Sequence, residues 1–143
     1  MARQGQILAC PEAEQAVLGA LLIDHSAIYE VQAILQPDDF ANEGHRRTYC
    51  AMLALLQQNK RFDYVSLHDE LTRTSQLDMV GDGGNRGAAY LTWLINAVPT
   101  SAHAAHYAQI VHDYAMRRAL MQAAGQIAKL AHDEQNATEA ITK

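Results

Sequence analysis

The sequence has few of the residues that mark secreted or membrane proteins. Its 143 residues contain two cysteines, Cys10 and Cys50, which form no C-x-x-C pair. Two thiols can close only one bridge, which excludes a disulfide-rich secreted scaffold and favours a reducing compartment. The longest apolar run, 16–23, is far shorter than the ~20 residues of a membrane-spanning helix, and no signal-peptide-type stretch precedes Pro11. We therefore expect a cytoplasmic protein that does not associate with membranes.

Positive charge is also scarce. Eleven Lys and Arg residues against sixteen Asp and Glu leave a net charge of −5. A duplex-binding protein usually concentrates positive charge on one face to neutralise phosphates. Here the basic residues are scattered apart from three pairs, Arg46-Arg47, Lys60-Arg61 and Arg117-Arg118. The charge balance argues against direct nucleic-acid binding and favours protein partners.

The apolar residues follow a helical period. They make up 49% of the chain, which is of single-domain size and long enough to bury a core. No segment alternates apolar and polar residues for long enough to predict a strand. The predicted fold class is therefore all-α, with a compact multi-helix head followed by a long helix.

The first two helices have local start and stop signals. Pro11 suits a first helical turn because it has no N–H to lose, and Val17, Leu18, Leu21 and Leu22 then form one apolar face of the helix that it opens. Ser26 can cap a second helix. Pro37 stops that helix because it disfavours the helical conformation at Gln36.

The next elements follow the same logic. Asn42 can cap a third helix, and Asn59 can end it in the left-handed conformation. The predicted buried positions of this helix recur at i, i+3, i+4 and i+7: Tyr49, Met52, Leu53 and Leu56. Asp63 then opens a shorter helix, the segment 81–87 is too rich in glycine to be regular, and another helix follows over 88–98.

The segment 102–132 has no proline and predicts a helix of roughly 45 Å, which Ser101 can cap. One apolar face holds Tyr107, Ile110, Val111, Tyr114, Met121 and Ala128, and the nearly opposite face holds Met116, Leu120, Ile127 and Leu130. Each face needs its own neighbour. The sequence leaves open which of them packs against the head.

Three regions follow from these signals. We predict a flexible tail over 1–10, a helical head over 11–100 and a partial helical hairpin over 101–143. Asn136 and Glu139 have the spacing of a capping box, which predicts the start of the second hairpin helix. Because this helix has barely begun at Lys143, we expect the chain to be a piece of a longer protein.

The sequence offers no motif for chemistry. His103 and His106 are three residues apart on the long helix, but no third metal ligand is near them in sequence. The glycine-rich segment 81–87 lacks the lysine and hydroxyl of a phosphate-binding loop. Asp38-Asp39 follows a proline and is typical of a turn, not of a pair of catalytic carboxylates. We therefore expect no catalytic residue, metal or cofactor site, and we interpret the histidines as surface or capping residues.

Several short motifs follow one another along nearly the whole chain. The first is the run PEAEQAVLGALLID, from Pro11 to Asp24. The later ones are Asp38-Asp39-Phe40, His45-Arg46, Gln76-Leu77-Asp78-Met79-Val80-Gly81, Ala89-Tyr90-Leu91, Pro99-Thr100-Ser101 and Tyr107-Ala108-Gln109-Ile110-Val111. In order and spacing the chain resembles the N-terminal domain of the bacterial replicative DNA helicase, the DnaB family. That family tends to pass directly from Val-Gly into Ala-Tyr-Leu, so 82–87 is an insertion.

The resemblance implies a non-catalytic scaffold domain. Helical hairpins would pair between subunits of a hexameric ring, a trimer of dimers that docks primase, and a helicase loader is a further implied partner. A RecA-like ATPase motor that uses ATP and Mg²⁺ would lie beyond residue 143. We predict that the first apolar face of the long helix supplies the subunit contacts: Tyr107, Ile110, Val111, Tyr114 and Met121.

Three alternatives remain. The chain could be a free-standing helical adaptor related to the helicase head. It could be a helix-turn-helix DNA-binding protein with Arg46, Arg47, Lys60 and Arg61 on the nucleic-acid side. It could also be a small metal-dependent hydrolase that uses the histidines. A Walker A motif downstream of residue 143 would separate the adaptor from a helicase piece.

Overall fold

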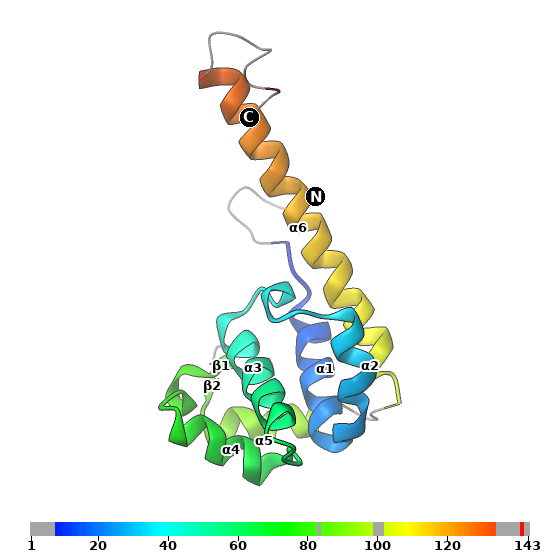
Figure 1. Cartoon of the computed structure of the whole chain (residues 1–143). Coiled ribbons are helices and arrows are strands. Elements are labelled where there is room, and N and C mark those ends of the chain that lie inside the picture. The colour runs from blue at the N-terminus through cyan, green and yellow to red at the C-terminus, as the bar shows by residue number, and fades with distance from the viewer. Residues whose placement is uncertain (1–7, 83, 99–101, 134–140, 142–143) are drawn as a thin grey trace.

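The computed structural model describes residues 8–82, 84–98, 102–133 and 141. Its helices are α1 (Pro11–Ile23), α2 (Ile28–Ile34), α3 (Glu43–Gln57), α4 (Tyr64–Arg73), α5 (Ala88–Asn96) and α6 (Ala104–Asp133). The short 3-10 helices are η1 (His25–Ala27), η2 (Pro37–Asp39) and η3 (Leu77–Met79), and the strands are β1 (Gly81–Asp82) and β2 (Asn85–Arg86). Helices α1 to α5 form the head, and the C-terminal half of α6 projects beyond it (Figure 1). The all-α class is confirmed.

Local capping signals place most helix starts. Pro11 occupies the first turn of α1. The Asn42 side chain accepts a hydrogen bond from the His45 backbone N–H at 3.0 Å. Asp63 and Ser66 form a reciprocal capping box at the start of α4, with N···O distances of 2.9 and 2.8 Å. These starts are confirmed, as is the left-handed conformation of Asn59, whose φ is 56°.

The predicted cap at Ser26 is wrong. The Asp24 carboxylate accepts hydrogen bonds from both the backbone N–H and the hydroxyl of Ser26, at 3.1 and 2.6 Å. This interaction folds residues 25–27 into η1, so that α2 begins only at Ile28. The predicted stop is confirmed, because α2 ends at Ile34 and Gln36 is extended with ψ of 157°.

The buried face of α3 is rotated from the predicted one. Tyr49 and Met52 are fully buried, but Leu53 and Leu56 are only partly buried. Leu55 is buried in their place, with 2% of its surface exposed. Because α3 contacts α4 as well as α1, its inward arc is wider than a single-neighbour period suggests.

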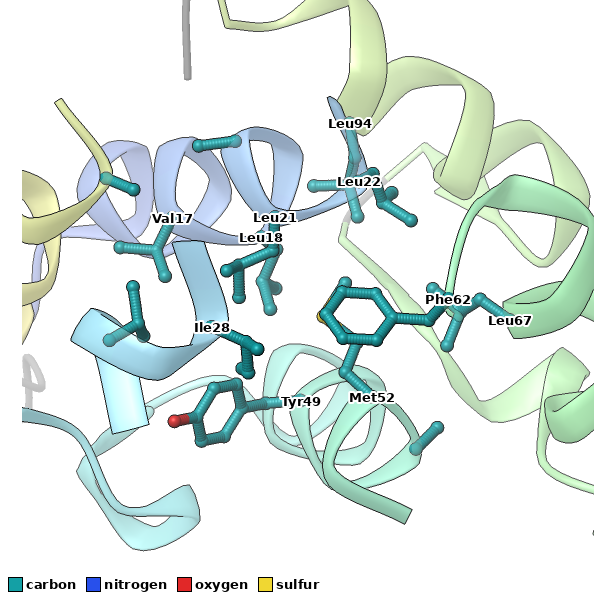
Figure 2. Close-up of a cluster of buried hydrophobic side chains, with 14 of the residues drawn as sticks. Val17, Leu18, Leu21, Leu22, Ile28, Tyr49, Met52, Phe62, Leu67 and Leu94 are labelled. Carbon is teal, nitrogen blue, oxygen red and sulfur yellow. The ribbon is translucent and has the colours of Figure 1, made fainter. Parts of the chain in front are cut away.

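The core lies where helices α1 to α5 meet the base of α6, and Figure 2 shows part of it. Its labelled residues are Val17, Leu18, Leu21 and Leu22 from α1, Ile28 from α2, Tyr49 and Met52 from α3, Leu67 from α4 and Leu94 from α5. Phe62, from the connection between α3 and α4, points toward Met52. The Tyr49 hydroxyl donates to the Leu35 carbonyl at 3.1 Å. Burial, with smaller effects of Asp39 and Cys50, raises the pKa of Tyr49 to about 12, so this phenol remains a donor at neutral pH.

The prediction that the glycine-rich segment 81–87 is irregular is wrong. β1 and β2 pair antiparallel, with Gly81 opposite Arg86. The Gly87 N–H also donates to the Val80 carbonyl at 3.1 Å. Gly44 at the start of α3 permits this arrangement, since a Cβ there would lie 2.6 Å from the Gly81 carbonyl oxygen. Pairing the short strands satisfies backbone groups close to the head.

Some predictions fall on residues that the structure does not describe. These are the cap at Ser101, the stop at Pro99 and the capping box of Asn136 and Glu139. The division into tail, head and hairpin stays a prediction. In the described ranges, no helix combines the length and the apolar character that crossing a bilayer requires.

Gly19 of α1 lies directly against the backbone of α5 at Leu94. A Cβ at this position would clash with the Leu94 carbonyl and would lie 2.5 Å from Cγ2 of Val98. We predict that Gly19→Ala lowers the free energy of unfolding by about 2 kcal/mol through overpacking. Urea denaturation followed by circular dichroism measures the change.

Gly125 in α6 provides the matched control, because a Cβ there would meet no atom within 4 Å. Gly125→Ala should raise the free energy of unfolding, by up to about 1 kcal/mol, through improved helix propensity. Equal stability of the Gly19→Ala and wild-type proteins would contradict the close approach of α1 and α5.

Candidate functional site

The base of α6 belongs to the head. Ala104, Ala108 and Val111 are buried, and the helix contacts α1 and α2. The two alanines have small side chains, which lets the helix backbones approach closely at this end. The first two turns of α6 are thus fixed to the head by packing.

Arg118 fixes α6 about two turns beyond Val111, the last buried residue of the helix. Its guanidinium donates to the Asp39 carbonyl at 2.6 Å and to the Leu8 carbonyl at 3.0 Å. On the same helix, Nδ1 of His112 lies 3.5 Å from a carboxylate oxygen of Asp39. We call these contacts of Arg118 and His112 the α6 clamp. The sequence contains no signal for Arg118, because its acceptors are main-chain carbonyls of distant residues.

The five predicted subunit-contact residues have different surroundings. Val111 is 1% exposed and is part of the head's core, so it has almost no surface left for a partner. Tyr107 and Ile110 are partly buried against the same core. Tyr114 is half-buried, with the Arg117 guanidinium 5.2 Å from its ring centroid, whereas Met121 is 57% exposed. Their role in subunit contact stays a prediction.

The other apolar face of α6 points away from the head. Met116, Leu120 and Ile127 are 52%, 68% and 67% exposed, and we call them the distal strip. At about 100° per residue they lie on the side of α6 opposite the buried Val111. None of them contacts the head's core cluster in the described ranges. The structure therefore decides part of what the sequence left open: the head covers the basal part of the first face, whereas Met121 further along that face and the distal strip are exposed.

A buried carboxylate joins α1 to the segment before α3. Glu14 is 2% exposed and accepts hydrogen bonds from the backbone N–H groups of Ala41 and Asn42, at 3.0 and 3.3 Å. Nδ1 of His45 lies 2.8 Å from the same carboxylate. The imidazole of His45 also stacks against the Tyr90 ring, with 5.9 Å between the two ring centroids.

His45 corrects the interpretation of the histidines as surface or capping residues. His45 is 0% exposed, and its partner Glu14 is also buried. Within the part of the chain that the structure describes, no three His, Cys, Asp or Glu residues are grouped to hold a metal ion. Cys10 and Cys50 are free thiols.

Ion pairs weaken the helix-turn-helix alternative. Arg46 and Arg47, two of its four DNA-side residues, both pair with Glu43, at 2.6 and 3.3 Å. Their charge is thus partly neutralised within α3. Only Lys60 and Arg61 of that set remain outside such pairs in the described residues.

Comparison with known proteins agrees with this architecture. The sequence profile of the family described as "DnaB-like helicase N terminal domain" matches residues 8–113. The chain belongs to this family. The DnaB N-terminal domain is a non-catalytic domain.

Individual relatives cover nearly the whole chain. The chain is 38% identical over 128 residues to the replicative DNA helicase DnaC of Bacillus subtilis. The crystal structure of the N-terminal domain of DnaB helicase from Mycobacterium tuberculosis is 34% identical, with a TM-score of 0.87 over 96% of this chain and 94% of that one. A DnaB-like replicative helicase whose structure includes its interactions with primase is 27% identical, with a TM-score of 0.72 over 93% of this chain.

The full-length relatives are much longer than this chain. The alignment covers 90% of this chain but 27% of the Bacillus subtilis protein. It covers 31% of the primase-interacting helicase. The chain thus corresponds to one DnaB domain.

The Glu14 carboxylate yields a test of the head. We predict that Glu14→Ala lowers the free energy of unfolding by about 3 kcal/mol, because the buried His45 ring and two part-buried backbone N–H groups lose their hydrogen-bond partner. Glu12→Ala is the control, since Glu12 is an exposed carboxylate in the same helical turn. It should change stability by less than about 0.5 kcal/mol. Equal losses in the two variants, measured by urea denaturation, would refute the role of Glu14.

Proposed function

We propose that this chain is the N-terminal scaffold domain of a replicative DNA helicase that unwinds duplex DNA at the replication fork. It pairs subunits through the projecting half of α6 and provides a docking surface for primase. The observation that carries the proposal is the uncovered distal strip on a helix whose base is clamped to the head.

The distal half of α6 needs a neighbour. An isolated helix of this length is marginally stable in water. Its apolar side chains face solvent, so their burial against a neighbour would stabilise the helix. Two neighbours fit: the second helix of a hairpin, formed by chain beyond the described residues, and α6 of another subunit. Both neighbours would cover α6 at the same time if hairpins pair between subunits.

Pairing would serve a motor that lies outside this chain. We propose that the parent protein continues beyond residue 143 into a RecA-like ATPase domain that binds ATP and Mg²⁺. Paired hairpins would hold such motors in a closed hexameric ring, because linked subunits re-bind at a high effective concentration. The proposed site of action is the bacterial cytoplasm, where a helicase loader is a further proposed partner.

Primase is the proposed docking partner because a DnaB-like helicase that is 27% identical to this chain interacts with primase. Docking sites that span two subunits would exist only in the paired state. Pairing of α6 and primase binding are therefore expected to be linked.

Self-association tests the pairing. We predict that Leu120→Asp combined with Ile127→Asp shifts the chain toward monomer in analytical ultracentrifugation, weakening association at least about tenfold, because charges replace apolar contacts. Tyr114→Asp combined with Met121→Asp tests the first apolar face of α6, which the sequence predicts as the subunit contact. We expect a smaller effect, since Tyr114 is already half-buried within the chain.

A charge control separates contact from repulsion. Gln122→Asp combined with Gln126→Asp adds the same charge at exposed polar positions of α6 and should leave association unchanged. Association that is unaffected by both apolar-face double variants would refute pairing through α6.

Primase binding gives a second test. Isothermal titration of the chain with the primase of the same genome should show binding, and the Leu120→Asp, Ile127→Asp variant should bind at least about tenfold more weakly. Equal binding by the monomeric variant would refute a composite site. Absence of a Walker A motif in the codons beyond 143 would favour the free-standing adaptor instead.

A further inference from the structure

A surface groove follows the seam between α2 and α3. It consists of two neighbouring hollows of about 260 and 220 Å³, and Leu56 lines both. The wall from α2 includes Tyr29 and Gln32, and the wall from α3 includes Leu53. The groove lies on the head, so its walls do not depend on the distal strip.

The floor of the groove is apolar and its rim is aromatic. Ile28 and Leu35 are buried beneath it, with exposures of 0% and 1%. Tyr29 stands at the rim with 63% of its surface exposed, and Phe62 closes the hollow at the α3–α4 connection. An exposed tyrosine beside a buried apolar floor provides a pocket for one large apolar side chain.

The charge of the groove is opposite to that of the chain. None of the residues that line the two hollows is acidic, although the chain carries a net charge of −5. Lys60 and Arg61 lie at one end together with His25, and both cations are exposed. In the described ranges neither cation forms an ion pair, whereas Arg46, Arg47 and Arg73 do. The backbone N–H of Ser66, with a smaller contribution from the charge of Arg61, lowers the pKa of the Asp63 carboxyl, so Arg61 has a weak acidic neighbour outside the groove lining.

The other end of the groove is lined by amides. Gln32, Gln36 and Gln57 border the second hollow and are exposed. Amide side chains can both donate to and accept from a peptide backbone. From one end to the other, the groove therefore offers three kinds of contact: cations, an apolar pocket and amides.

We propose that this groove binds an acidic linear segment of a partner protein. A large apolar side chain of the segment packs between Tyr29 and Leu56, its carboxylates lie against Lys60 and Arg61, and its backbone meets the glutamines. This binding is additional to subunit pairing and requires no residue of α6.

The contacts favour a peptide over single-stranded nucleic acid. A nucleic-acid groove combines several cations along its length with several stacking rings. Here the cations occupy one end, and Tyr29 is the one strongly exposed aromatic ring of the described lining.

The test uses short fluorescein-labelled peptides and this chain at low ionic strength. One probe combines glutamate with leucine and phenylalanine, a second has lysine in place of every glutamate, and a third has serine in place of every apolar residue. Oligothymidylate is the nucleic-acid probe. We expect fluorescence anisotropy to detect binding of the first probe alone, with affinity falling as salt is added.

Variants locate the site. Lys60→Glu combined with Arg61→Glu, and separately Tyr29→Ala, should each weaken binding of the first probe about tenfold. Lys129→Glu reverses the charge of an exposed lysine on α6 and should leave binding unchanged. All these positions are exposed, and circular dichroism should report an unaltered fold.

Several results would overturn the proposal. These are binding that the groove variants do not weaken, equal binding of the lysine or serine probes, and oligothymidylate binding that the groove variants abolish. Measuring the first probe on the Leu120→Asp, Ile127→Asp variant separates the two surfaces. Retained binding there supports an independent groove even if α6 pairing fails, and lost binding refutes it.

Discussion

The buried carboxylate of Glu14 is the contact on which the arrangement of this domain depends. It binds backbone N–H groups 27 and 28 residues away and the imidazole of His45, 31 residues away. A buried carboxylate is costly unless its oxygens are satisfied, and here one group satisfies donors from the turn and from α3 at once. The interaction therefore holds the segment between α2 and α3 at a defined position on α1.

The position of α6 follows from that segment. η2 ends two residues before Ala41, the first residue that Glu14 holds, and the Asp39 carboxylate accepts from the Gln36 N–H at 3.0 Å, which closes this turn. The Asp39 carbonyl in turn accepts from Arg118. A continuous set of contacts thus leads from the core of the head to the middle of the long helix. The direction in which the distal strip is presented is set by the head, and not by α6 alone.

The DnaB-family membership and the two proposed surfaces are typical of a domain that functions through protein–protein contacts. The fold is shared with the Mycobacterium tuberculosis domain over almost its entire length. Residues 81–82 and 85–86 pair as short antiparallel strands, and Gly81 lies close to Gly44 at the start of α3. The distal strip and the α2–α3 groove lie on different elements and differ in chemistry. One is a row of aliphatic side chains, and the other is apolar with cations at one end.

Local signals in the sequence were sufficient to predict the helix starts at Pro11, Asn42 and Asp63 and the length of α6. Each depends on partners within a few residues, or on an unbroken helical period. Tertiary structure alone decided the burial of His45, the role of Arg118 and which face of α6 the head covers. Arg118 and its acceptor Asp39 are 79 residues apart, and the acceptor is a main-chain carbonyl that every residue possesses. Periodicity finds the two apolar faces of a helix, but only packing determines which of them is already occupied.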